Sequence, residues 1–146
     1  MHLDELIARE EIRSVIARYN HAGDRGRLDE LLACFDENGV MELADLPPLQ
    51  GREAIRRHLA GVVADLAAHS TRPILRHHVS SILIELSAPG EATAHSYFAV
   101  YTERGLDHWG RYGDHFTRSD GLWRIARRRV RVDGAAPGSR MVRDPS

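Results

Sequence analysis

The chain has 146 residues and a formal net charge of −1, with 42% hydrophobic and 28% charged residues. This length and composition are typical of one globular domain, and no apolar run is long enough to span a membrane. All 20 basic residues other than histidine are arginine, which excludes lysine Schiff-base chemistry and a Walker A phosphate loop.

The N-terminal half is predicted to be mostly helical, because its apolar residues recur at helical spacing. Gly23 ends the first helix, so that Asp24 lies just past the helix terminus. A second, short helix holds Cys34 as a packed thiol and Phe35 in its apolar stripe. The expected elements are a helix over 4–22, a helix over 27–36, a strand over 39–44 and a helix from about 52 to 68.

The C-terminal half is predicted to form four strands, since it is rich in β-branched and aromatic residues. Short connectors at 87–90, 104–107 and 119–121 make these strands sequential antiparallel neighbours. The strands are expected over 74–86, 92–103, 108–118 and 122–132. We therefore expect one domain over residues 1–133 and a flexible tail over 134–146.

This order of elements predicts an α+β fold, with three N-terminal helices on a curved antiparallel sheet that encloses a pocket in a cone. A β-bulge in the first long strand would supply part of the curvature. Ile82, Ile84 and Leu86 are apolar residues at alternate, even-numbered positions, but this alternation does not continue back through His77 and His78. A bulge between the two groups would change which histidine faces inward.

His77 and His78 are adjacent, so on a regular strand they face opposite sides of the sheet. Asp24 at the end of the first helix could meet whichever imidazole points inward. A carboxylate in that position orients the ring and stabilises the imidazolium, while the free ring nitrogen moves protons. The alternative is that the histidine is a partly exposed strand residue and Asp24 a helix-end residue.

Four segments have the order and spacing of a known family. They are the stretch 12–19 leading to Asp24 and Leu28-Asp29-Glu30-Leu31-Leu32, Gly51-Arg52-Glu53-Ala54-Ile55, Arg76-His77-His78-Val79, and Gly110-Arg111-Tyr112-Gly113-Asp114 followed by residues 120–128. With these segments the chain resembles the SnoaL-like family of the nuclear-transport-factor-2-like superfamily over roughly residues 3–133.

The resemblance implies a catalytic set of four residues. Scytalone dehydratase, bile-acid 7α-dehydratase and the hexachlorocyclohexane dehydrochlorinase share an aspartate after the first helix and a histidine on the first long strand, which match Asp24 and His77. The spacing to Glu85 favours His77 over His78. The bile-acid enzyme's active-site tyrosine matches Tyr19, and a basic residue of the dehydrochlorinase matches Arg128.

The resemblance also implies a substrate-binding set, with two departures from scytalone dehydratase. That enzyme's second catalytic histidine falls at about Thr102 here, and its active-site asparagine falls near Tyr112, so the substrate differs. The predicted substrate-binding residues are Tyr112, His78, Thr102, Phe35 and Trp109.

The function that these matches imply is a cofactor-free lyase or isomerase, of dehydratase or cyclase type, that acts on a small and largely apolar metabolite. His77 would be the general base, or the acid–base group of an elimination, and Asp24 would orient it. One alternative is a noncatalytic protein of the same fold that binds a small molecule or a partner. Another is epoxide hydrolysis, in which Asp24, Arg128 and Asp114 would activate water.

No metal site or cofactor is expected, because His95, His108, Asp114 and His115 lack the spacing of a ligand motif. Nucleic acid and membrane are not expected partners, given the balanced charge. A lone cysteine and an N-terminus without an apolar leader predict a cytoplasmic protein. Outward-facing Val130, Val132 and Trp109 predict a homodimer or trimer.

Overall fold

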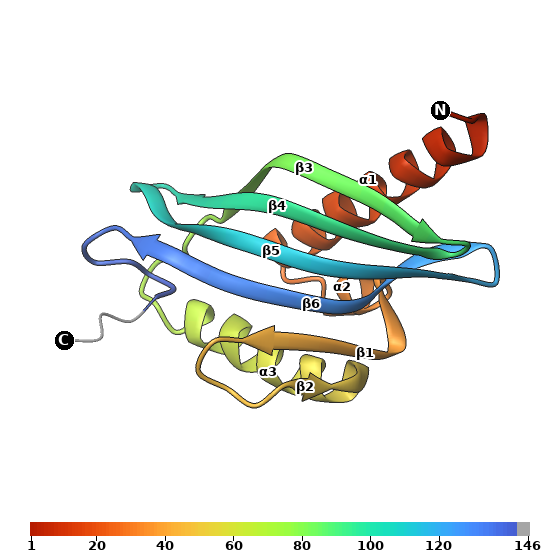
Figure 1. The fold of residues 1–146 in the computed structure, drawn as a ribbon. Coiled ribbons are helices and arrows are strands. Elements are labelled where there is room, and N and C mark those ends of the chain that lie inside the picture. The colour runs from red at the N-terminus through yellow and green to blue at the C-terminus, as the bar shows by residue number, and fades with distance from the viewer. Residues whose placement is uncertain (143–146) are drawn as a thin grey trace.

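The computed structural model describes residues 1–142 as three helices and a single six-stranded sheet. The helices are α1 (Leu3–Asp24), α2 (Leu28–Leu32) and α3 (Gly51–Ala67). Helix α1 packs on β3 and β6, and α3 packs on β1 and β2, so the helices cover one face of the sheet (Figure 1). We call this covered side the inner face and the opposite side the outer face.

The sheet is curved, unclosed and mixed, in the order β2-β1-β6-β5-β4-β3. Strands β1 and β6 pair in parallel, and every other pair is antiparallel. The strands are β1 (Phe35–Leu43), β2 (Leu49–Gln50), β3 (Arg76–Ala88), β4 (Glu91–Thr102), β5 (Gly105–Ser119) and β6 (Leu122–Ala135). The predicted α+β class and the curved sheet under N-terminal helices are confirmed.

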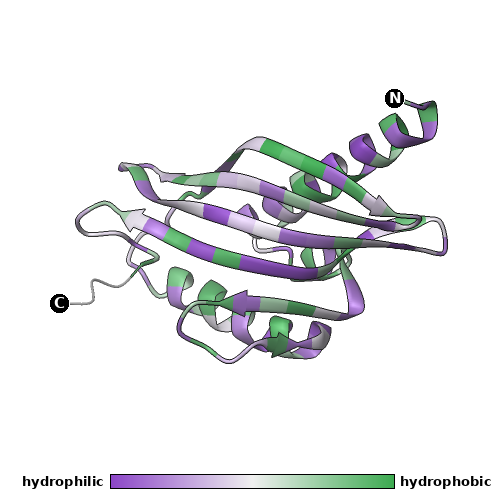
Figure 2. Cartoon of the chain, in the orientation of Figure 1, coloured by the Kyte–Doolittle hydropathy of each residue, from purple (hydrophilic) through white to green (hydrophobic). Residues whose placement is uncertain are grey.

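Alternation of apolar and polar residues along the strands explains why only one face of the sheet is covered. In β4, Ala94, Ser96 and Phe98 are buried, whereas His95 and Tyr97, which lie between them, are exposed. Figure 2 shows the same alternation along β6. The inner residues join the apolar side of α1 in one core, which includes Ile12, Ile16, Tyr19, Phe35, Ile84, Phe116 and Ile125.

The bulge predicted in the first long strand is present. The pairing of β3 with β4 shifts between Ser80 and Leu83, and Ser81 has a φ of 51°, in the left-handed region. On the N-terminal side of the bulge His77 and Val79 share one parity, and beyond it Ile84 lies on the same inner face with the other parity. The bulge therefore aims His77 inward and leaves His78 outward.

Helix α2 and the connectors differ from the sequence prediction. The helix ends at Leu32 rather than near residue 36, and Cys34 is a buried free thiol in the turn after it. The carbonyl of Cys34 accepts the backbone N–H of Ile125 at 2.7 Å, so pairing with β6 draws Phe35 into β1. Strand β5 begins at Gly105, which places Asp107 in a strand instead of a turn.

The start of the predicted tail is part of the fold. Strand β6 runs two residues past the expected boundary, to Ala135. Residues 136–142, which we call the C-terminal strap, contact Asp107: the Ser139 hydroxyl and the Arg140 backbone N–H each donate to its carboxylate at 2.7 Å. The rest of the predicted tail, residues 143–146, lies outside the described residues.

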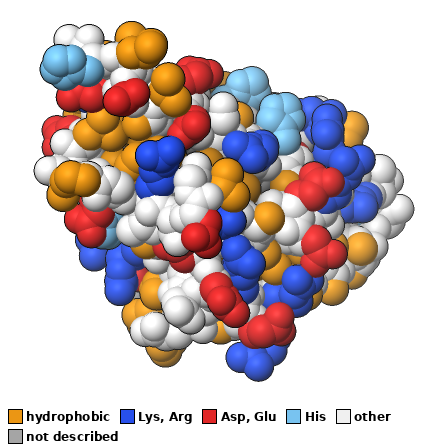
Figure 3. Space-filling view, turned by 90° about the vertical axis from the view of Figure 1, so that its right-hand side faces the viewer, with side chains coloured by type: hydrophobic (Ala, Val, Ile, Leu, Met, Phe, Trp, Pro, Cys, Tyr) orange, Lys and Arg blue, Asp and Glu red, His pale blue; other side chains and the backbone are white. Residues whose placement is uncertain are grey.

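Charges are mixed over the surface. Figure 3 shows acidic, basic and apolar side chains interspersed on one side of the molecule, with no large area of a single charge. Many arginines pair with carboxylates on neighbouring strands, as Arg127 and Arg129 do with Glu42. Among the described residues no helix is both long and apolar enough to cross a membrane.

Candidate active site in the sheet interior

Asp24 and His77 meet at the end of α1. The Nδ1 atom of His77 lies 2.5 Å from Oδ1 of Asp24, and the backbone N–H of His77 donates to Oδ2 at 3.1 Å. The two side chains are only 17% and 11% exposed. Because the carboxylate accepts the Nδ1 proton, the ring presents Nε2 as a free acceptor.

Arg128 lies at the centre of the interior, with no exposed surface. Its Nε and Nη2 atoms donate to the two oxygens of Asp114, each at 2.8 Å. Its guanidinium carbon lies 4.2 Å from the ring centre of Tyr19 and 3.9 Å from that of Tyr112. Burial alone would lower the pKa of Arg128, but the charge of Asp114 raises it overall, so the group is a fixed cation.

Two tyrosines frame this cation. Burial raises the pKa of Tyr19 and of Tyr112, so both phenols stay protonated. The hydroxyl of Tyr112 donates to Oδ1 of Asn20 at 3.3 Å, and the charge of Asp24 contributes to the raised pKa of Tyr112. Asn20 was not predicted as a site residue. Its place beside Ile16 and Tyr19 on the buried side of α1 is the signal that could have identified it.

A second histidine–carboxylate pair was also missed. Nδ1 of His108 lies 2.7 Å from Oδ2 of Asp107, and the two side chains are 8% and 3% exposed. The His108 ring packs edge-on against Phe98, which in turn stacks on Tyr112. Alternation along the strand predicts that His108 points inward. The pairing of Asp107 with His108 depends on the C-terminal strap, and no pattern in the local sequence indicates it.

The predicted substrate-binding residues are only partly brought together. Phe35 has no exposed surface, and its ring lies 6.0 Å from that of Tyr19. His78 is exposed on the outer face, with its ring 4.9 Å from the ring of Tyr101. Tyr112 and Phe35 therefore join the interior group, and His78 does not.

Trp109 and Thr102 also lie apart from that group. Trp109 is 39% exposed and covers Gly134, where an added Cβ would come within 2.3 Å of the indole ring. Thr102 ends β4, and its hydroxyl accepts the backbone N–H of Arg104 in the turn. The pairing of β5 is irregular near both positions, between Val100 and Tyr101 against β4 and between Trp109 and Gly110 against β6.

The four histidine and aspartate positions considered for a metal are divided between the faces. His95 and His115 lie on the outer face, whereas His108 and Asp114 lie inside. Among residues 1–142, no three histidine, cysteine, aspartate or glutamate side chains converge in a way that could hold a metal ion.

The family model for the SnoaL-like domain matches residues 4–129, which is most of the chain and all of the site described above. The chain belongs to the SnoaL-like family. No curated protein is similar enough in sequence to count as a match.

Solved structures share the fold of this SnoaL-like chain. A protein from Novosphingobium aromaticivorans assigned as a scytalone dehydratase is 25% identical, with a TM-score of 0.78 over 90% of this chain and 88% of that one. An NTF2-like protein with a cystatin-like fold from the same organism is 26% identical, with a TM-score of 0.78 over 97% and 93%. LinA, at 15% identity, has a TM-score of 0.79 over 93% and 94% and shows the fold alone.

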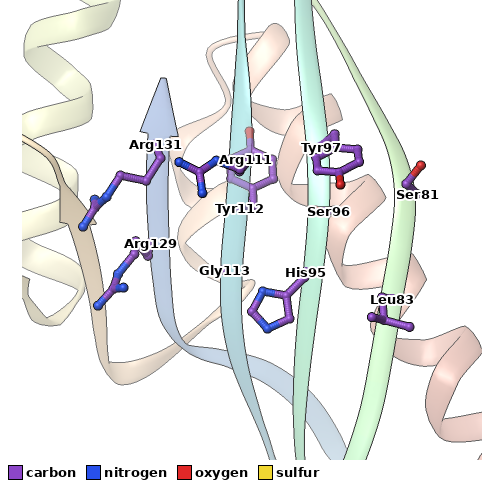
Figure 4. Close-up of a pocket in the computed structure, with 10 residues that line it drawn as sticks. All are labelled: Ser81, Leu83, His95, Ser96, Tyr97, Arg111, Tyr112, Gly113, Arg129 and Arg131. Carbon is purple, nitrogen blue, oxygen red and sulfur yellow. The ribbon is translucent and has the colours of Figure 1, made fainter. Parts of the chain in front are cut away.

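The SnoaL-like chain also has a hollow of 320 Å³ that opens on the outer face of its sheet. Gly113 leaves a gap there, and Figure 4 shows His95, Leu83 and Arg129 around it. Arg129 is already paired with Glu42, and Arg111 at the rim is paired with Asp133. The hollow is therefore a surface feature separate from Asp24 and His77.

Proposed function

We propose that the chain is a cofactor-free lyase or isomerase in which His77 transfers a proton and Asp24 orients it. The observation that carries this proposal is the 2.5 Å contact between His77 Nδ1 and Asp24 Oδ1, made in a nearly buried setting. A buried carboxylate bonded to one ring nitrogen fixes the tautomer and leaves the other nitrogen for chemistry. The relatives of this family are consistent with action on a small molecule.

The reaction follows from that geometry. Nε2 of His77 takes a proton from a carbon next to an electron-withdrawing group, and the electron pair of the C–H bond forms a new double bond. The Asp24 carboxylate stabilises the imidazolium that results. In an isomerisation the same proton returns to another carbon, and in a dehydration it leaves with the hydroxyl as water, so each reaction regenerates neutral His77.

Tyr19 and Arg128 would polarise the carbonyl that makes the carbon acidic. Two of the nitrogens of Arg128 bind Asp114, and its Nη1 has no partner among the described residues. A buried N–H donor without a partner is costly unless something else accepts it. A substrate oxygen is the acceptor that we propose, with Tyr112 and Phe35 as aromatic walls that suit a largely apolar molecule.

Epoxide hydrolysis is not favoured by this arrangement. It would need Asp24, Arg128 and Asp114 around one water molecule, but both oxygens of Asp114 accept hydrogen bonds from Arg128. A noncatalytic binding protein is the outcome that remains if proton transfer fails the test below.

Benzisoxazole tests proton transfer without knowledge of the natural substrate. Its ring opens when a base removes one carbon-bound proton and the N–O bond breaks, which gives an absorbing cyanophenol. We expect His77→Ala to lower the rate by about 10²- to 10⁴-fold. The matched control is His78→Ala, which removes the adjacent, outward-facing imidazole and should keep the rate. A wild-type rate equal to that of His77→Ala would contradict the proposal and favour the binding protein.

We also propose that the chain forms a dimer or trimer with copies of itself through the outer face. Leu83 and Tyr97 are 57% and 58% exposed on neighbouring strands, and Trp109 lies on the same face. Apolar side chains grouped in this way usually meet a partner. The lone Cys34 suits a reducing compartment, so we propose the cytoplasm as the location.

A further inference from the structure

His108 has the environment of a proton-transfer residue, although its role is not explained by the pair of Asp24 and His77. It is buried, yet its Nδ1 lies 2.7 Å from a carboxylate of Asp107 that is itself buried. Among residues 1–142, Nε2 of His108 has no hydrogen-bond partner, as is also true of Nε2 of His77. The two histidines thus present the same chemical group in the same way.

The register of the sheet places the two histidines in one row on the inner face. His77 pairs directly with Val100 in the neighbouring strand, and Val100 pairs directly with His108 in the next. Residues that are direct cross-strand partners point to the same side of the sheet, and each step is about 5 Å. The two imidazoles therefore stand roughly 10 Å apart at their backbones, on either side of the small apolar side chain of Val100.

Asp107 is held by more than His108. The Ser139 hydroxyl and the Arg140 backbone N–H donate to its two oxygens, and the backbone N–H of Ala136 donates to its carbonyl. Burial would raise the pKa of Asp107, but these hydrogen bonds and that of His108 lower it overall, so the group stays ionised. The C-terminal strap thus keeps a carboxylate behind His108, as α1 keeps Asp24 behind His77.

The C-terminal strap also contacts the apolar cluster beside the row formed by His77, Val100 and His108. Met141 packs against the cluster that contains Leu66, Phe98 and Val100. A hollow of 360 Å³ lies between the strap and the end of α3, lined in part by Leu66 and Met141. A small molecule that entered there would reach Leu66 and Met141 of this cluster, whose Phe98 packs against His108 and whose Val100 is the cross-strand partner of both histidines.

We propose that His108, fixed by Asp107, is a second catalytic residue that works with His77 across Val100, so that a substrate loses a proton to one imidazole and receives one from the other. This inference rests on the proposed function of His77. It names the substrate class more closely: a ring or chain small enough to lie between the two imidazoles, with an acidic C–H on one side and a hydroxyl or carbon to be protonated on the other.

The pair carries one proton before and after each turnover. In a dehydration, neutral His77 takes the proton from carbon, the C–H electron pair forms the double bond, the C–O bond breaks, and protonated His108 gives its proton to the leaving hydroxyl to form water. Burial lowers the pKa of His108 below its usual 6.5, with an opposing contribution from Asp107 and a further lowering by the charge of His77, so a protonated His108 gives up its proton readily. The next turnover runs with the roles exchanged or after the proton moves back.

The experiment compares four proteins on benzisoxazole over a range of pH: the wild type, His77→Gln, His108→Gln and the double variant. We expect a bell-shaped profile for the wild type, because one ring must be neutral and the other protonated. Each single variant should lose about 10²-fold or more and keep only one limb of the bell. The double variant should be little worse than either, as expected for residues that act as a unit. His95→Gln, a histidine on the outer face of β4, is the control and should match the wild type.

The outcomes separate this inference from the proposed function. If His77→Gln lowers the rate and His108→Gln does not, or lowers it without changing the shape of the profile, the second catalytic role is wrong and the first stands. If His77→Gln changes nothing, both are wrong.

A second measurement on the same proteins does not depend on turnover. Nitrogen-15 NMR of the imidazole rings should show that His77→Gln raises the pH at which His108 titrates, because the charge of His77 lowers the pKa of His108, whereas His95→Gln leaves it unchanged. Titration of His108 that does not respond to His77→Gln would overturn the pairing.

Discussion

Arg128 and Asp114 form a salt bridge with two hydrogen bonds in which neither side chain has any exposed surface. The pair joins β5 and β6 directly, because Asp114 and Arg128 are cross-strand partners. Two aromatic rings flank the guanidinium, which has no exposed surface. The stability of the fold should therefore depend on this pair far more than on any ion pair at the surface.

We expect Asp114→Ala to lower the free energy of unfolding by about 3–5 kcal/mol, because it leaves the buried charge of Arg128 uncompensated. Urea denaturation measures the change. Asp133→Ala is the matched control: it removes the carboxylate that pairs with Arg111, where the two side chains are 57% and 40% exposed, and should cost about 1 kcal/mol or less. Equal losses for the two variants would contradict the structural role of the buried pair.

Local patterns in the sequence predict much of this fold. The helical spacing of α1 and α3 and the alternation along β4 each reflect burial on one side, which neighbouring residues are enough to indicate. The start of β1 at Phe35 is different. It depends on parallel pairing with β6, about ninety residues away, and the sequence around Phe35 continues an apolar helical stripe. Long-range pairing overrode that local preference.

The candidate site also has one part that local sequence patterns predict and another part that they do not. Asp24 and His77 follow from a helix end and from a bulge that the parity of Ile84 and its neighbours reveals. His78 and Trp109 were predicted to be site residues, but both lie on the outer face of the sheet. The reason is the parity of their positions on the strands, together with the bulges beside them. The pairing of Asp107 with His108 needs Ser139 of the C-terminal strap, a contact that no local pattern predicts.

Asp24→Asn tests the orienting role of the carboxylate. An amide at this position no longer stabilises the imidazolium, so we expect the rate on benzisoxazole to fall by about 10²-fold or more. In the double variant with His77→Ala the further loss should be small, because the carboxylate acts only through the ring. Losses that multiply in the double variant would show that Asp24 has a separate role. Circular dichroism should show that each variant keeps its secondary structure.

The environment of His108 predicts how stability depends on pH. Burial lowers its pKa in the folded chain, with a smaller contribution from His77 and an opposing one from Asp107. The unfolded chain then binds the proton first as the pH falls below about 6.5, so the folded state loses stability from there down to the folded pKa. The lowered pKa of Asp107 adds a loss of the same sign, but only below the usual range of a carboxyl group.

We therefore expect the free energy of unfolding to decrease between pH 7 and pH 5, and His108→Gln to make that decrease smaller. Urea denaturation at the two pH values measures it. His95→Gln, which removes an exposed histidine, should leave the difference between the two pH values as it is in the wild type. A decrease that is unchanged in His108→Gln would mean that other groups cause it.

The last prediction concerns assembly through the outer face. Trp109 was expected there and is 39% exposed, whereas Val130 packs against the interior cluster. Val132 is 46% exposed, but as the cross-strand partner of Gly110 it has the same inward parity as Val130, so it does not belong to the outer face. The greater apolar exposure lies on β3 and β4, at Leu83 and Tyr97. Charged side chains at these two positions should separate the copies, since a carboxylate without a partner is costly to bury in an interface.

Sedimentation velocity at micromolar concentration should show a dimer or trimer for the wild type and a monomer for the double variant Leu83→Glu, Tyr97→Glu. The control is Leu46→Glu, which places the same charge on a leucine that is 44% exposed in the connection between β1 and β2, away from the outer face. This variant should sediment like the wild type. A monomeric wild type would contradict the proposed assembly, and a double variant that stays assembled would place the interface elsewhere on the molecule.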